Sequence, residues 1–202
     1  RLQMKLMGKL DEKDSKMLDS ATGTIVSQVE ALRELVDAFG DYAQGPKLVR
    51  APIAIDQLIK DVVALYQHED QRVNFRLKLI AGPPGFSADS GQIRQLLHNL
   101  VVNSSEAVAK DQQAEVSIRS RQITQAGKKW LELEVSDRGP GYPAMVLENP
   151  FEPYVTFKAN GSGLGLAICR KIVSEHDGRI TIHNPTIGGA CTTIILPVNT
   201  NT

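Results

Sequence analysis

The stretch NGSGLGLAICRKI, residues 160–172, places three glycines at alternate positions directly before an amphipathic helical pattern. A dinucleotide-binding fingerprint has the spacing G-x-G-x-x-G after a strand, and a P-loop requires a lysine followed by serine or threonine. Neither template fits, because the glycines are Gly161, Gly163 and Gly165 and no parallel core strand is predicted before them. A glycine loop before a helix still offers backbone N–H groups to an anion. A plain glycine hinge is the alternative.

Composition narrows the possible functions. The chain has 202 residues with 23 basic and 23 acidic side chains, and its net charge of zero argues against nucleic-acid binding. No apolar run approaches the roughly 20 residues that span a bilayer, so we expect no direct membrane contact. Cys169 and Cys191 lack metal-ligand spacing and are expected to be reduced core residues of a cytoplasmic segment. Because Arg1 lies within a helical pattern, we interpret the chain as part of a longer protein, whose N-terminal region could anchor it in the inner membrane.

Residues 1–45 predict part of a helical hairpin. Residues 2–10 look like the end of one helix, residues 11–15 like a polar turn, and residues 18–43 like a long helix. The long helix has apolar positions in alternating steps of four and three, with a second apolar stripe beside them. Such a wide apolar face favours a bundle completed by a second copy, hence a homodimer. Packing against the rest of the same chain is the alternative. Prolines and a glycine mark residues 46–55 as a linker.

Residues 56–198 predict an α+β domain. The predicted helices cover residues 56–66, 90–110 and 163–176, and the predicted strands cover 73–79, 115–123, 129–137, 179–184 and 191–197. A Gly/Pro-rich loop region is predicted between 138 and 162. Helices interleaved with strands that are mostly joined as hairpins predict an α/β sandwich, in which a mixed sheet carries helices on one face.

The helix predicted at 90–110 carries a polar stripe that could bind a cation. Its core positions are Ile93, Leu96, Leu97, Leu100, Val101 and Val108, and its stripe consists of Gln92, Gln95, Asn99, Asn103, Glu106 and Lys110. Asn99 and Asn103 lie one turn apart, although asparagine is a poor helix former. Their amide oxygens could hold hydrated Mg²⁺ and a phosphate oxygen if a nucleotide supplies the other ligands. A solvated helix face is the alternative.

A carboxylate is directed inward in WLELEVSDRGPGY, residues 130–142. Leu131, Leu133 and Val135 alternate with polar residues, so parity places Asp137 on the apolar face. A buried carboxylate needs a hydrogen-bond donor, and the exocyclic amine of adenine is a suitable one. Gly139 and Gly141 leave open backbone space beside it. The alternative is an aspartate that only caps the turn.

Together these segments resemble the ATP-binding domain of sensor histidine kinases, within the group that includes Hsp90, MutL and type II topoisomerase ATPases. The family's N, G1, F, G2 and G3 boxes are matched in order over residues 89–197 by DSGQIRQLLHNLVVNSSEAV, DRGPGYP, NPFEPYVTFK, GSGLGLAI and GGACTTIILP. The earlier segment VEALRELVDAFGDYAQGPK is similar to the second helix of the family's dimerisation and phosphoacceptor hairpin. Its sequence is similar to that of nitrogen-regulation sensor kinases of the NtrY type.

The resemblance implies a site for ATP or ADP with Mg²⁺. Asn103 would ligate Mg²⁺, and Asn99 would contact phosphate or help to order the site. Asp137 would bind the adenine amine, with Gly139 and Gly141 shaping the pocket.

The resemblance also implies a mobile lid over the phosphates, formed by Gly161, Gly163, Leu164 and Gly165. Lys158 would be a phosphate contact, and Thr192 or Thr193 would lie near the adenine. Three residues replace the family's common Asn, Thr and Ala: Arg138, Phe157 and Ser104, respectively.

The implied activity is that of an ATP-dependent protein-histidine kinase, which transfers the γ-phosphoryl group to a histidine for relay to the aspartate of a response-regulator receiver domain. The family's H-E-x-x-N-P motif does not occur around His68, His98, His176 or His183. We therefore expect the phosphoacceptor to lie upstream of Arg1 and expect no autophosphorylation by this chain.

Two other functions stay open. One is an ATPase of the chaperone or mismatch-repair kind, although Asn99 stands where its general-base glutamate would lie. The other is a scaffold that binds no nucleotide.

Overall fold

The computed structural model of the chain describes residues 11–43, 48–79, 86–109, 112–156, 158 and 161–198. The chain divides into two compact units, Arg1–Ala43 and Gln44–Thr202. Within the described ranges, no helix combines the length and the apolar character needed to cross a bilayer.

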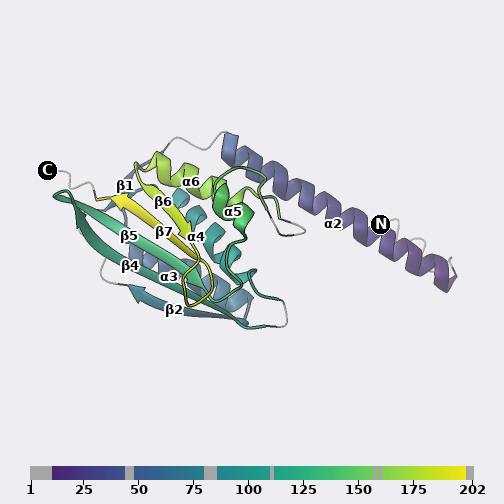
Figure 1. Ribbon diagram of the computed structural model, residues 1–202. Helices are drawn as coiled ribbons and strands as arrows, with labels where there is room; N and C mark the ends of the chain where they lie inside the picture. The colour runs from purple at the N-terminus through teal and green to yellow at the C-terminus, as the bar shows by residue number, and fades with distance from the viewer. Residues whose placement is uncertain are drawn as a thin grey trace. The chain divides into compact units, whose positions relative to one another are not determined.

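The described part of the first unit is one helix, α2, Glu12–Ala43 (Figure 1). The polar turn predicted over residues 11–15 is wrong, because the helix already begins at Glu12. The Asp11 side chain causes the early start: its Oδ1 accepts a hydrogen bond from the Asp14 N–H at 2.8 Å, which satisfies a backbone donor of the first turn. The helix predicted at 2–10 lies outside the described residues.

The second unit contains a five-stranded mixed sheet in the order β2-β4-β5-β7-β6 (Figure 1). Its strands are β2 Val73–Leu79, β4 Ala114–Gln125, β5 Lys128–Asp137, β6 Arg179–His183 and β7 Cys191–Pro197. β2 pairs with β4 in parallel, and the other neighbouring pairs are antiparallel. β4 and β5 form a hairpin whose turn residues, Ala126 and Gly127, both have positive φ.

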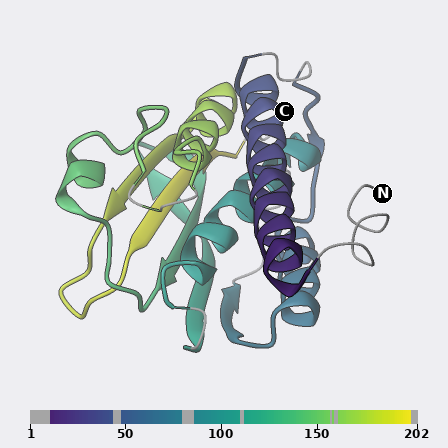
Figure 2. The same ribbon diagram turned by 90° about the vertical axis from the view of Figure 1, so that its right-hand side faces the viewer.

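Three helices cover one face of this sheet, as Figures 1 and 2 show: α3 Ile55–Glu69, α4 Ser90–Ser105 and α6 Gly165–Glu175. The alternating apolar side chains of β5 point toward the helices, and the core row of α4 meets them. The fully buried residues of these two elements are Leu131, Leu133, Val135, Ile93, Leu96, Leu97, Leu100 and Val101. The predicted fold class, a mixed sheet with helices on one face, is confirmed.

Several predicted element boundaries are wrong. α4 ends at Ser105 rather than at residue 110, because residues 106–109 turn away, which leaves Val108 only half-buried. Gln92 of the predicted polar stripe is buried, and its Nε2 donates to Glu175 Oε2 of α6 at 3.0 Å. The predicted loop contains a short helix, α5 Ala144–Glu148. Lys110 lies outside the described residues.

The segment predicted as a linker, residues 46–55, is described from residue 48 onward, and this part packs against other residues of the second unit. β1 Ala51–Pro52 pairs with β3 Ser87–Ala88. Next to it, Arg50 Nη2 lies 2.6 Å from Asp177 Oδ2, and the Val49 N–H donates to Asp89 Oδ2 at 2.9 Å. Asp89 Oδ1 also accepts from the backbone N–H groups of Gly91 and Gln92, so Asp89 both caps α4 and holds the incoming chain.

We expect Asp89→Ala to lower the free energy of unfolding by about 1–2 kcal/mol, because it removes the cap of α4. Burial alone would raise the pKa of Asp89, but the hydrogen bonds from Val49, Gln92 and Gly91 outweigh it and lower that pKa. The stabilisation is therefore present above the ordinary value of 3.8 and is lost as the pH falls through that value toward the folded-state pKa. Urea unfolding followed by Trp130 fluorescence measures the effect. Ser90→Ala, an exposed neighbour, is the matched control, and equal losses in both variants would contradict the capping role.

Candidate functional site

Asp137 ends β5 and is only partly exposed. Its Oδ1 accepts hydrogen bonds from the backbone N–H groups of Gly139, at 2.9 Å, and Ala190, at 3.2 Å, and its carboxylate also bonds with the Ser104 side chain. Burial raises the pKa of Asp137 above its ordinary value, and the hydrogen bonds offset only part of that rise. A carboxylate has about four acceptor positions, so this one keeps capacity for a further donor.

The loop after Asp137 is held between α4 and β6. A Cβ added to Gly139 would lie 2.8 Å from Ala107 Cβ, so a larger residue would push the loop away from the end of α4. Gly141 has a φ of +87°, in the left-handed region that favours glycine. Asn184 closes the far side: its Oδ1 accepts from the Tyr142 N–H at 2.8 Å, and its Nδ2 donates to the Tyr142 carbonyl at 2.9 Å.

Strand register separates the two candidate threonines of β7. Thr192 is opposite Val135 and faces the helices, whereas Thr193 is opposite Glu134 and faces away from them. Thr193 is therefore excluded from the Asp137 side of the sheet. The Thr192 Oγ1 lies 2.7 Å from the Tyr142 hydroxyl, whose pKa burial raises to about 12, so the phenol is neutral at physiological pH.

Asn99 and Asn103 lie against the start of α6. A Cβ added to Gly165 would lie 3.5 Å from Asn103 Nδ2 and 3.8 Å from Asn99 Oδ1. The predicted pair of amides on α4 and the predicted glycine at the helix start, distant in sequence, are therefore neighbours. The first N–H groups of α6 point to this region, which suits an anion.

Lys158 places a cation beside the same asparagine. Its Nζ donates to Asn103 Oδ1 at 3.3 Å and lies 2.8 Å from Glu106 Oε2. The Asn103 oxygen is thus oriented toward a positive charge, as a magnesium ligand must be. Among the described residues, no group of three or more His, Cys, Asp or Glu side chains could hold a metal ion. A metal here would therefore depend on sparse protein ligands and on phosphate oxygens.

The glycine loop packs tightly against the segment before it. Gly163 has a φ of +68°, and a Cβ there would lie 2.5 Å from the backbone carbon of Tyr154. The Gly161 N–H donates to the Lys158 carbonyl at 3.1 Å. Leu164 is buried, so its side chain belongs to the core and only its backbone can face a ligand. Of this region, residues 157, 159 and 160 lie outside the described residues.

A known protein family matches the part of the chain that forms this site. Residues 88–200, more than half of the chain, match the model of the histidine kinase-, DNA gyrase B- and HSP90-like ATPase family. The chain belongs to this family. The predicted resemblance to a histidine-kinase ATP-binding domain is confirmed by that match and by the relatives below.

The curated relatives of this chain include a sensor histidine kinase and a nitrogen regulation protein. The chain is 35% identical to the sensor histidine kinase TmoS of Ectopseudomonas mendocina, over 77% of the chain and 16% of TmoS. It is 32% identical to the nitrogen regulation protein NtrY of Azorhizobium caulinodans, over 91% of the chain and 24% of NtrY. The chain thus spans a quarter or less of either relative. Since NtrY is one of several similar relatives, assignment to the NtrY type stays a prediction.

Solved structures of similar fold include the nucleotide-free catalytic domain of the histidine kinase ThkA. It is 28% identical, with a TM-score of 0.63, and the match covers 76% of this chain and 97% of that one. ThkA in complex with the response regulator protein TrrA matches at 23% identity with a TM-score of 0.67, over 97% of this chain and 55% of that one.

Two histidines of the ATPase domain, His98 and His176, are engaged by neighbouring residues of the fold. The His98 ring contacts the Tyr66 ring, with centroids 5.6 Å apart, and its Nδ1 is hydrogen-bonded to the Tyr66 hydroxyl. His176 is buried, with Nδ1 2.8 Å from the Ile172 carbonyl and Nε2 accepting from the Asp89 N–H at 3.0 Å. These bonds favour the neutral tautomer with the proton on Nδ1.

Sequence reasoning missed two residues of the site. Ser104 was singled out only as a departure from the family pattern, and its bond to Asp137 was not foreseen. Tyr142 directly follows the DRGPG motif, but its contact with Thr192 depends on a strand that lies 50 residues later.

Proposed function

We propose that this chain is the nucleotide-binding part of a sensor histidine kinase, together with part of its dimerisation hairpin. The whole protein would transfer the γ-phosphoryl group of ATP to a histidine, for relay to a response-regulator aspartate. The observation that carries this proposal is that one helix, α4, contacts both the region proposed for the phosphates and the region proposed for the adenine. Asn99 and Asn103 lie beside Gly165, and the Ser104 side chain is hydrogen-bonded to Asp137.

Each half of the site would hold one end of the nucleotide. Asp137 would accept the adenine amine, supported by Ser104 and by the neutral pair of Tyr142 and Thr192. Gly139 and Gly141 would shape the pocket by allowing the loop to pack closely against Ala107 and Asn184. The residues proposed to lie over the phosphates are Gly161, Gly163, Leu164 through its backbone, Gly165 and Lys158.

Asn103 would ligate Mg²⁺, and Asn99 would contact a phosphate or orient the site. When bound, Mg²⁺ neutralises phosphate charge, and phosphoryl transfer then depends mainly on positioning. Lys158 lies beside Asn103 in the described structure, so it would have to turn toward the phosphates as the ion takes its place. Glu106 can retain the ammonium group during that movement.

α2 would contribute to a homodimer. Among the side chains of α2 that the structure describes, large apolar ones are exposed at Met17, Ile25, Val26 and Val29, and a partner helix would cover them. The structure of ThkA with TrrA supports a response-regulator receiver domain as a further partner. We propose no nucleic-acid partner, because the net charge is zero.

Calorimetric titration with ADP tests the proposal. The chain should bind ADP more tightly with Mg²⁺ than with EDTA, and incubation with labelled ATP should leave no acid-labile phosphate on it. Hydrolysis should be negligible, because Asn99 cannot act as a general base. Absence of heat with any adenine nucleotide would favour the scaffold, and rapid hydrolysis would favour the chaperone-like ATPase.

A further inference from the structure

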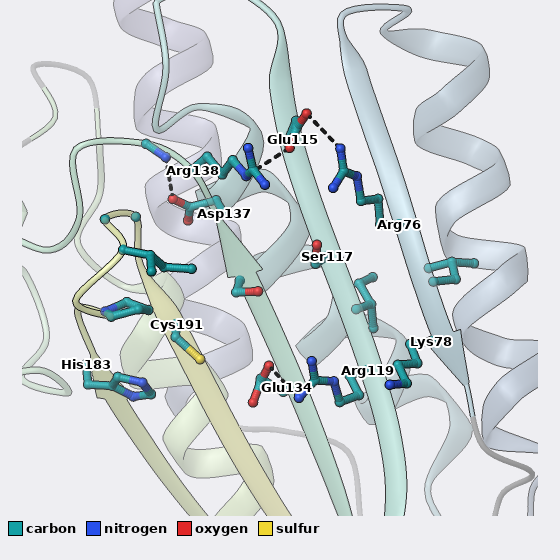
Figure 3. Close-up of a pocket in the computed structure, with 18 residues that line it drawn as sticks. Arg76, Lys78, Glu115, Ser117, Arg119, Glu134, Asp137, Arg138, His183 and Cys191 are labelled. Carbon is teal, nitrogen blue, oxygen red and sulfur yellow. Dashed lines mark hydrogen bonds and ion pairs between the residues drawn. The ribbon is translucent and has the colours of Figure 1, made fainter.

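The face of the sheet opposite the helices carries a hollow of about 910 Å³ (Figure 3). Its floor is one row of residues in register across all five strands: Arg76, Ser117, Ser136, Cys191 and His183. The three central strands contribute only small side chains to this row. The result is a trough, defined by these five residues, with a guanidinium at one edge of the sheet and an imidazole at the other.

Charged side chains line the walls of the trough, and two of the arginines share one carboxylate. Arg76 Nη2 lies 3.2 Å from one oxygen of Glu115, and Arg138 Nε lies 3.0 Å from the other. Arg119 Nη1 lies 3.7 Å from Glu134 Oε1. Figure 3 shows these side chains on the same face as the trough. Three arginines are therefore served by two carboxylates.

Lys78 adds a fourth cation. It lies directly opposite Arg119 in the β2–β4 register, and a like-charge pair in that arrangement costs stability. Within the described ranges, no carboxylate pairs with Lys78. Asp137 also borders the hollow, and its Oδ1 accepts hydrogen bonds from the N–H groups of Gly139 and Ala190. The four cations of the hollow thus outnumber its three carboxylates, Glu115, Glu134 and Asp137, and this excess of positive charge is the complement of an anionic ligand.

We propose that the trough binds an acidic polypeptide segment of a partner protein, extended across the strands. Five strands spaced about 4.8 Å apart span roughly 19 Å, which is the length of about six extended residues. A small anion would leave most of that length empty. At the rim, Ile187 is 93% exposed and offers an apolar contact beside the charges.

The carboxylates in the walls favour a peptide over a nucleic acid. A nucleic acid carries a phosphate at every step and would be repelled by Glu115 and Glu134. A peptide can instead place two or three carboxylates at the cations and uncharged residues elsewhere. The five-residue row of the trough lies on the other face of the sheet from Thr192, because Cys191 faces the trough and its neighbour Thr192 faces the helices. Asp137 and Gly139 border both the hollow and the proposed nucleotide site. A peptide seated on the five-residue row should nevertheless leave the helix side of Asp137 free for the nucleotide.

Fluorescence anisotropy of the full chain with a labelled hexapeptide of alternating glutamate and alanine tests the proposal. We expect binding that weakens strongly at high salt and is unaffected by saturating ADP. Lys78→Glu should weaken binding by about tenfold or more, while the thermal midpoint stays the same or rises, because the new carboxylate faces Arg119. Ser117→Phe, which fills the floor of the trough, should also weaken binding. Lys60→Glu, an exposed change of equal charge on α3, is the matched control and should have little effect.

Three results would overturn the proposal. They are equal weakening by Lys78→Glu and Lys60→Glu, unchanged affinity in Ser117→Phe, and tighter binding of a six-nucleotide oligothymidylate than of the peptide. Because Asn103 does not border the hollow, the Asn103→Ala variant should bind the peptide normally, so failure of the proposed nucleotide site would be distinguished from failure of the trough.

Discussion

Asp137→Asn is expected to weaken ADP binding by roughly 30- to 1,000-fold, which corresponds to about 2–4 kcal/mol. In the variant, the amide oxygen can keep the hydrogen bonds from the Gly139 and Ala190 N–H groups. The amide nitrogen then replaces the other carboxylate oxygen, so it would present donors where the adenine amine also presents donors. The change removes a charge-assisted bond and leaves a buried donor without an acceptor.

The same substitution should not destabilise the free protein at neutral pH. Burial raises the pKa of Asp137, so the folded chain holds a proton more tightly than the unfolded chain. The wild type therefore loses stability as the pH rises from 3.8 through the raised pKa, and the asparagine variant avoids that loss. Thermal unfolding at acidic and neutral pH, with and without ADP, separates the two effects. A variant that loses stability and ADP binding together would show a structural role for Asp137 instead.

Glu134→Gln is the control for the loss of a carboxylate from the same strand. Glu134 faces the other side of the sheet and pairs with Arg119, so its removal should leave ADP affinity unchanged. If both variants lost affinity equally, the inward direction of Asp137 would not explain the result.

Local periodicity predicted much of this fold. The alternation of Leu131, Leu133 and Val135 correctly assigned the buried face of β5, and parity then placed Asp137 at its inward end. The three- and four-residue spacing on α4 likewise predicted that Leu96, Leu97 and Leu100 are buried. These features depend on residues close in sequence, so one chain is enough to infer them.

Contacts between distant segments could not be predicted in this way. Gln92 has the spacing of a solvated residue, yet it is buried because α6 brings Glu175 to it. The choice between Thr192 and Thr193 required the register of β7 on β5. The trough is a property of all five strands together, since Ser117 and Ser136 are ordinary strand residues until Arg76 and Cys191 are aligned with them.

A second large effect, on the Mg²⁺ dependence of ADP binding, is expected when Asn103 is replaced. Its replacement by alanine should remove most of the Mg²⁺ dependence of ADP binding, so that affinities with Mg²⁺ and with EDTA become similar. Loss of an outer-shell partner alone typically costs a metal site about 10–100-fold in affinity, and loss of a direct ligand should cost at least as much. Titration of Mg²⁺ into the ADP complex, followed by calorimetry, measures this directly without any catalytic assay.

The contacts of Lys158 allow a second test of the proposed Mg²⁺ site. In the described structure its ammonium group is shared by Asn103 and Glu106, so it is a positive charge that Mg²⁺ must displace. Glu106→Gln removes the ion-pair partner and should strengthen ADP binding in EDTA, because Lys158 becomes available to phosphate, while dependence on Mg²⁺ persists. Arg94→Ala, an exposed change on the same helix, is the control and should alter neither quantity. Retention of full Mg²⁺ dependence in Asn103→Ala would show that the metal ligand lies elsewhere, and Lys158 would then pair with Asn103 only as part of the surface of α4.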